Sequence, residues 1–192
     1  MPRKRLKLTE KQKFVLGAAV VVGFTYLLKK GVSMVPKIGL AFKDGFPIGP
    51  IVLHSVGKSR SGLEIYLKED VAKDFLRMVA DAKFQANLIL RPVSGFRDMA
   101  LQTALYAKAV SAGAARFALL QQPNLNPYPP TAKPGFSNHQ AGEAIDYDSG
   151  MTLDEFRAGK KTAIFNWVEA NAAKYGFKRL PSESWHLSRD GR

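Results

Sequence analysis

The stretch SNHQAGEAIDYD, residues 137–148, decides how this part of the chain folds. Polar and apolar residues alternate over 143–148, which is typical of a short β-strand. Asp146 stands in that strand beside apolar residues, where an unpaired carboxylate is costly to bury. We therefore expect a cation next to Asp146, and His139, at the start of the stretch, is a candidate ligand for a metal ion.

A second stretch, ESWH at residues 183–186, adds a second imidazole and a second carboxylate. Two imidazoles and one carboxylate form the three-ligand set that leaves Zn²⁺ an open fourth position for water. Glu183 precedes His186 by three residues, near enough to accept a proton from that water as a general base. The two stretches together predict a catalytic zinc site.

Each of these residues also has a structural interpretation. A single histidine is more often a hydrogen-bonded structural residue than a ligand, and an aspartate often caps a turn. His54, the third histidine of the chain, is assigned this structural role. The combination of residues, and no single one of them, favours the metal site.

Three ordered motifs resemble the VanY-type D-alanyl-D-alanine carboxypeptidases. They are S-x-H-x-x-G-x-A-x-D at 137–146, E-x-W-H at 183–186, and SGFRD at 94–98 followed by Gln102. That group belongs to the LAS zinc metallopeptidases, which also include D-Ala-D-Ala dipeptidases and phage L-alanyl-D-glutamate endolysins. The resemblance extends over roughly residues 64–188.

The resemblance implies a cofactor, a substrate and a role for each matching residue. The implied ligands of Zn²⁺ are His139, Asp146 and His186. Glu183 is the implied general base, and Arg97 lies where a planar cation can stabilise the oxyanion or a substrate carboxylate. Ser137 and Gln102 match positions that contact the substrate or support the residues around the metal. The implied reaction is hydrolysis of an amide bond at a D-amino acid of the peptidoglycan stem peptide. Without the motif, Arg97 would be interpreted as a surface arginine at a helix start.

Two shortened segments keep other functions open. Six residues separate Gly176 from Glu183, and six follow His186, so we expect a groove more open than that of a carboxypeptidase. An open groove also suits an endopeptidase that cuts within the stem peptide, such as a phage endolysin or a virion-associated enzyme. An alternative of another class is a non-catalytic cell-wall-binding membrane protein.

The N-terminal residues predict a membrane segment. Residues 1–30 carry eight basic side chains against one acidic, +7 of the total net charge of +13, and the run 14–28 is free of charges. We expect residues 1–35 to be a basic leader with a transmembrane or signal-anchor helix. The positive-inside rule then leaves the N-terminus cytoplasmic and the following domain on the periplasmic or extracytoplasmic side. A signal peptide cleaved after Ser33 and a buried helix with a basic leader are the alternatives.

Composition excludes several other classes of protein. The chain has 192 residues and no cysteine, so it holds one main domain with no disulfide, thiolate zinc site or cysteine nucleophile. More than half of the net positive charge lies in the leader, and the remainder has no Lys/Arg run interleaved with aromatic residues. We expect no specific nucleic-acid partner.

The remaining pattern predicts an α+β fold, a small antiparallel sheet with flanking helices. We expect a linker over 36–50 and a peptidase domain over 51–192. The predicted elements are a hairpin of strands 51–54 and 63–66, a helix over 69–83, a strand over 87–90, a helix over 98–120, a proline-rich loop over 121–134, a strand over 143–148, and a helical region from Thr152 to Tyr175 ended by Gly176.

Overall fold

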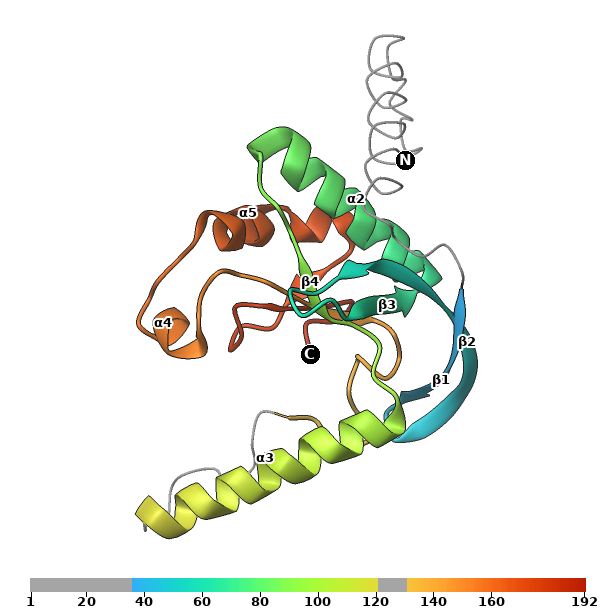
Figure 1. Ribbon diagram of the computed structural model, residues 1–192, viewed down its shortest axis with the longest axis vertical. Helices are drawn as coiled ribbons and strands as arrows, with labels where there is room; N and C mark the ends of the chain where they lie inside the picture. Colours follow the sequence, from blue (N-terminus) through green and yellow to red (C-terminus); the bar gives the residue numbers. More distant parts are fainter. Residues whose placement is uncertain (1–35, 121–130) are drawn as a thin grey trace, which may run out of the picture. The chain divides into compact units, whose positions relative to one another are not determined.

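The computed structural model describes residues 36–120 and 131–192, apart from the side chains of 113–120. These residues form two antiparallel sheets with helices packed beside them, which confirms the α+β prediction (Figure 1). The predicted membrane segment lies outside the described residues. Among the helices that are described, none has both the length and the apolar character that a membrane span requires.

The first sheet has the order β1-β2-β3, with β1 at Lys37–Lys43, β2 at Phe46–Lys58 and β3 at Glu64–Lys68. The β2–β3 hairpin agrees with the predicted strand pair, although both strands are longer than expected. The expected linker over 36–50 is wrong, because these residues form β1 and the start of β2.

Glycines that were interpreted as linker residues allow the β1–β2 hairpin to pack closely and to turn. At Gly39, a Cβ atom would lie 2.7 Å from the Leu53 side chain, so only glycine permits that packing. Asp44 and Gly45 form the turn with positive φ angles of 50° and 87°, a conformation that Asn, Asp and Gly tolerate best. Glycine here marks close packing and a tight turn.

The second sheet has the order β4-β5-β7-β6, with β4 at Pro92–Ser94, β5 at Ala144–Tyr147, β7 at His186–Ser188 and β6 at Lys178–Arg179. The predicted strand over 143–148 is β5. The strand expected over 87–90 is absent from this described region, where Asn87 ends the preceding helix in a left-handed conformation and strand pairing begins at Pro92. Leu90 is buried there without joining a strand ladder.

Helix α2, Glu69–Ala86, packs against β2 and β3 and supplies much of the core. Val71, Phe75 and Met78 recur at helical spacing and are fully buried. Glu69 and Asp70 occupy the first turn, where acidic side chains interact favourably with the helix dipole. Helix α3, Met99–Leu120, follows the predicted range, and Asp98 accepts a hydrogen bond from the Leu101 amide at its start.

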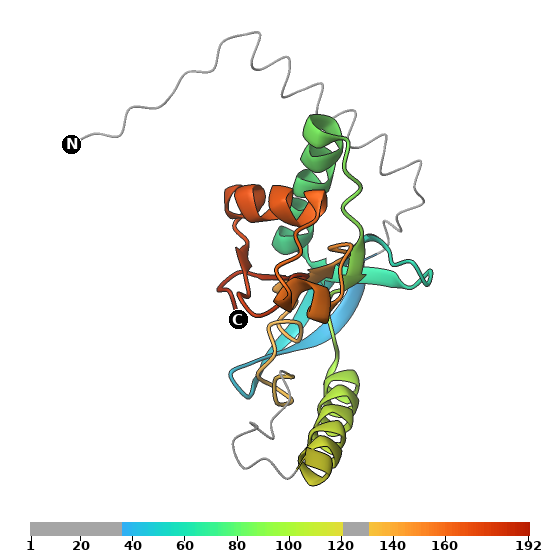
Figure 2. The same cartoon turned by 90° about the vertical axis from the view of Figure 1, so that its left-hand side faces the viewer.

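The helical region expected from Thr152 to Tyr175 is divided. Helix α4, Leu153–Arg157, begins with the predicted capping box of Thr152 and Glu155. Helix α5, Ala163–Asn171, has its own cap at Thr162 and continues into a 3₁₀ turn that Gly176 ends with φ 74°. The break has a local cause, since Gly159 adopts a φ of 87°. Figure 2 shows α5 beside α2, consistent with the shared core of their side chains.

Candidate active site

Sheet pairing brings the two metal-binding motifs together. Asp146 is paired with His186 of β7 on one side and with Ser94 of β4 on the other. Because directly paired residues on neighbouring antiparallel strands project from the same face, the Asp146 carboxylate and the His186 ring are side by side. Two residues far apart in sequence thus become neighbours through one strand register.

His139 reaches the same place from a compact turn before β5. The Gly142 amide donates to the His139 carbonyl at 3.2 Å, and Gly142 itself has φ 69°. A Cβ atom at Gly142 would lie 3.1 Å from the backbone of Lys68 at the end of β3, so glycine permits the turn to pack closely behind the site.

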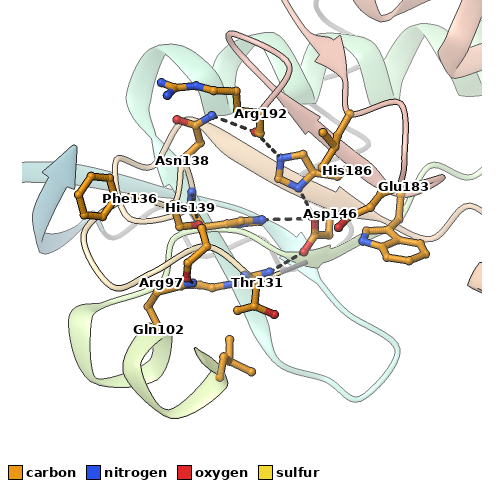
Figure 3. A pocket seen from close by; sticks show the side chains of 15 residues that line it. Arg97, Gln102, Thr131, Phe136, Asn138, His139, Asp146, Glu183, His186 and Arg192 are labelled. Carbon is orange, nitrogen blue, oxygen red and sulfur yellow. Dashed lines mark hydrogen bonds and ion pairs between the residues drawn. The ribbon is translucent and has the colours of Figure 1, made fainter. Parts of the chain in front are cut away.

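The three predicted metal ligands converge in a buried cluster (Figure 3). His139 Nε2 lies 3.3 Å from Asp146 Oδ1, and His186 Nδ1 lies 2.9 Å from the same oxygen. Their relative exposures are 2%, 7% and 7% for His139, Asp146 and His186. One potential ligand atom from each residue lies within 4.8 Å of the others.

Backbone carbonyls fix which nitrogen of each histidine faces the cluster. His139 Nδ1 is 2.7 Å from the Gly95 carbonyl, and His186 Nε2 is 2.9 Å from the Arg192 carbonyl. A carbonyl oxygen can only accept, so each of these nitrogens carries the hydrogen. In the neutral rings, the opposite nitrogens then direct lone pairs at the Asp146 carboxylate, an arrangement that is repulsive unless a cation lies between them. The donor set therefore fits a divalent metal such as Zn²⁺.

The charges around Asp146 favour its ionised form. Burial by itself raises the pKa of the Asp146 carboxyl, but His139, His186 and Arg97 outweigh that effect and hold the pKa well below its ordinary value. Burial lowers the pKa of His139. For His186, burial opposes the charged form, yet the hydrogen bond that the protonated ring donates to Asp146 raises the pKa overall. The cluster thus holds a carboxylate that attracts a cation.

Comparison with known proteins agrees with this geometry. Residues 64–188, well over half of the chain, match the family VanY, described as D-alanyl-D-alanine carboxypeptidase. The chain belongs to the VanY family. The sequence-based assignment to this family is therefore confirmed.

Two relatives match parts of longer proteins. A Bacillus subtilis (strain 168) protein that carries a carboxypeptidase name, YodJ, is 34% identical over 64% of this chain and 45% of its own length. A D-alanyl-D-alanine carboxypeptidase of Enterococcus faecium is 30% identical over 65% of this chain and 34% of its own length. The match thus spans less than half of either relative.

Solved structures support the fold. The structure of VanYB in complex with D-alanine-D-alanine superposes with a TM-score of 0.54 over 78% of this chain and 84% of that one, at 20% identity. The zinc complex of a mutant VanY from a VanB-type resistance cassette superposes with a TM-score of 0.53. It covers 72% of this chain and 78% of that one, also at 20% identity. The VanY domain shares its architecture with both.

Arg97 contacts the cluster of predicted metal ligands directly. Its Nη2 donates to Asp146 Oδ2 at 2.7 Å and its Nε donates to Ser94 Oγ at 3.0 Å. The Gly95 backbone reaches β3 closely enough that a Cβ would collide with the Tyr66 carbonyl, which holds this loop in place. Arg97 therefore orients the ligand carboxylate, a contact that the sequence-based role at the scissile carbonyl did not include.

The other predicted site residues lie around one cavity of about 380 Å³. Gln102 is fully buried, its Nε2 donates to the Ala132 carbonyl at 2.7 Å, and its Oε1 has no partner among the described residues. Ser137 Oγ lies 3.3 Å from the His139 amide, which donates to it. Glu183 is half-buried at the cavity wall, and burial raises the pKa of its carboxyl. All seven predicted residues contribute to this cavity, which is lined by Arg97, Gln102, Ser137, His139, Asp146, Glu183, His186, Trp185, Phe136 and others.

Asn138 is the residue that the sequence did not reveal. Its side-chain amide donates to Asp190 Oδ1 at 2.6 Å and to the Arg192 carbonyl at 2.9 Å. The Arg192 carbonyl is also the acceptor of His186 Nε2, so Asn138 helps to position the group that orients a metal ligand. Its place between the motif's serine and histidine is the only sequence signal, because its contacts come from the distant segment 190–192.

Proposed function

We propose that this VanY domain is a zinc-dependent peptidoglycan peptidase that hydrolyses an amide bond at a D-amino acid of the stem peptide. The observation that supports the proposal most strongly is that the unprotonated nitrogens of His139 and His186 both face the Asp146 carboxylate. The three residues line a cavity that Glu183 and Arg97 also line. His139, Asp146 and His186 would hold the zinc ion. When bound, zinc acidifies a water molecule and polarises a carbonyl oxygen.

Glu183 is assigned the proton transfers. Its carboxylate accepts a proton from the attacking water and returns it to the amide nitrogen as the carbon–nitrogen bond breaks. The products are a carboxylate and a free amine. Burial raises the pKa of Glu183, which brings its basicity closer to what transfer near neutral pH requires.

Arg97 and Gln102 are assigned the binding of the peptide. The guanidinium of Arg97 has five N–H donors, of which the contacts with Ser94 and Asp146 use two, so it can also donate to the developing oxyanion. Gln102 Oε1 is a buried acceptor without a partner among the described residues, and it suits an N–H of the substrate backbone. A D-alanyl-D-alanine end is the favoured substrate because the fold is shared with VanYB, which was solved with that dipeptide.

A second candidate reaction is cleavage within the stem peptide or cross-link. Between Gly176 and Glu183, the chain forms only the two-residue strand β6, and Leu180 is the one residue of this short segment that lines the cavity. A low wall at this side leaves room for a peptide that continues past the scissile bond. Such an endopeptidase could belong to a bacterial envelope or to a phage, as an endolysin or virion-associated protein.

We propose in addition that residues 14–28 anchor the protein in the membrane with its N-terminus cytoplasmic. The support is the uncharged run itself, with basic residues on both flanks. The domain then lies on the periplasmic or extracytoplasmic side, where peptidoglycan is found.

Mass spectrometry of purified muropeptides, incubated with the full chain in mild detergent and zinc, tests the reaction. We expect a loss of terminal D-alanine that disappears with chelation, and a rate lower by about 10²–10⁴-fold in Glu183→Gln. Zinc content should be unchanged in that variant, since Glu183 is not a ligand. Fragments cut inside the stem would identify the endopeptidase. Wall binding without any product would indicate a non-catalytic binding module.

A further inference from the structure

The β1–β2 hairpin carries a cluster of apolar side chains on its surface. Scattered exposed apolar residues are ordinary, whereas a contiguous group marks an interaction site. We call the group the hairpin face; it consists of Ile38, Leu40, Phe46, Ile48 and Val52, which are 64%, 53%, 73%, 53% and 41% exposed.

The strand register places most of these side chains on the outer side of the hairpin. Ile38 is paired with Val52, and Leu40 is paired with Pro50, so these side chains project from the same side. Between them, Ala41 and Leu53 point inward and are fully buried. Strand β1 packs chiefly on β2, and in Figure 1 the two strands curve along the edge of the domain.

Basic side chains outnumber acidic ones within the hairpin itself. Residues 37–58 contain three lysines and one aspartate, a net charge of +2, and Lys43 and Lys58 also pair with Glu143 and Glu64. An apolar face flanked by lysines matches the boundary between acyl chains and anionic head groups, which attracts both features. A water-exposed peptidoglycan strand would not offer apolar contacts to the hairpin face.

The chain also limits how far this face can lie from a membrane. Seven residues separate Lys30, at the end of the predicted anchor, from Ile38 in β1. Fully extended, the eight Cα–Cα steps between Lys30 and Ile38 span at most about 28 Å. The hairpin face therefore lies on the first described strands after the predicted anchor.

We propose that the hairpin face docks on the surface of an anionic lipid bilayer, as a second membrane contact beside the proposed anchor, on which this inference rests. The hairpin tip connects this contact to the cavity. The Gly45 amide donates to the Gly135 carbonyl at 3.0 Å, and a Cβ atom at Gly45 would lie 2.8 Å from the ring of Phe136, which lines the cavity. Docking would hold the mouth of the cavity close to the membrane.

The absence of cysteine makes a direct test possible. Ile48→Cys and Ile89→Cys are matched variants, because the two isoleucines are 53% and 51% exposed and only Ile48 belongs to the hairpin face. Each full-length variant is labelled with a small fluorophore and reconstituted in phosphatidylcholine–phosphatidylglycerol vesicles that contain nitroxide lipids. We expect the lipid quencher to reduce the fluorescence at position 48 several times more strongly than at position 89. Leu40→Asn in the Ile48→Cys background should reduce that difference.

Other outcomes overturn the proposal in distinguishable ways. Equal quenching at both positions on vesicle-bound protein would exclude docking and leave the anchor intact. If the fluorophore at position 48 is shielded from solvent in the absence of lipid, and the shielding depends on protein concentration, a second copy of the chain covers the hairpin face. If the fluorophore is shielded in the absence of lipid at every protein concentration, the leader covers the hairpin face. A chain that does not bind vesicles would remove both the anchor and the docking, while muropeptide digestion still tests the peptidase separately.

Discussion

The two sheets depart from the usual distribution of side chains in opposite directions. Beside the β4-β5-β7-β6 sheet, a carboxylate and two imidazoles are buried and a guanidinium is partly buried, whereas the β1–β2 hairpin exposes five apolar side chains. Buried charges require partners, and exposed apolar surface costs roughly 25 cal/mol per Å² relative to burial. Each departure therefore indicates what completes the region: a cation for the first and an apolar surface for the second.

The largest expected effect tests the buried side of this comparison. Asp146→Ala removes the partner of Arg97, whose side chain is 18% exposed, and should destabilise the metal-free protein by about 3–5 kcal/mol. Asp148→Ala is the matched control near the end of the same strand. It removes an ion pair with Arg60, whose side chain is 73% exposed, and a hydrogen bond from the Gly150 amide, and should cost about 1–2 kcal/mol. Urea unfolding with a chelator present measures both, and similar losses would contradict the distinction.

A pair of leucines compares burial directly. Leu53→Ala should destabilise the protein by about 2–5 kcal/mol because Leu53 is fully buried behind the hairpin. Leu40→Ala, on the outer side, should change the stability by at most about 0.5 kcal/mol in detergent-free buffer. Urea unfolding curves of the two variants measure both changes in stability. If Leu40→Ala were as destabilising as Leu53→Ala, the hairpin face would be covered within the protein.

A variant of Asn138 tests whether a residue outside the predicted ligand set contributes to zinc affinity. Asn138→Ala should weaken zinc binding by about 10–100-fold, because the carbonyl that orients His186 loses one of its two donors. Asn166→Ala, at an exposed position of α5, should leave zinc affinity unchanged. Competition with a chromophoric chelator measures the affinity without relying on turnover. Equal zinc affinities in the two variants would show that Asn138 does not help to position His186 for zinc binding.

The smallest effect concerns Glu183. Because burial raises its pKa in the folded protein, ionised Glu183 opposes folding. This penalty is absent when the pH is below the ordinary value of 4.5, grows as the pH rises, and is complete above the raised pKa. Glu183→Gln should therefore raise the Tm of the metal-free protein near neutral pH, with a gain that shrinks as the solution is acidified. A gain independent of pH would show that packing, and not charge, is responsible.

Sequence reasoning was most successful where chemistry restricts the residue type. Only a few side chains can bind zinc or transfer a proton, so His139, Asp146, His186 and Glu183 could be selected before any fold was known. Helices α2 and α3 were also predictable, and the apolar residues of α2 recur at helical spacing. The linker over 36–50 was wrong because glycine and proline indicate both loops and close packing, and only the contact of Gly39 with Leu53 distinguishes the two.

The amino-acid sequence by itself determined the family and selected the candidate ligand set and the candidate general base, because these depend on residue identity and spacing. The tertiary structure decided what depends on distance: the pairing of Asp146 with His186, the carbonyls that fix both imidazoles, and the contact of Arg97 with Asp146. It also showed which side of β1 is exposed. Strand register and loop packing set these contacts, and both arise from the free energy of the whole core, which no local pattern records.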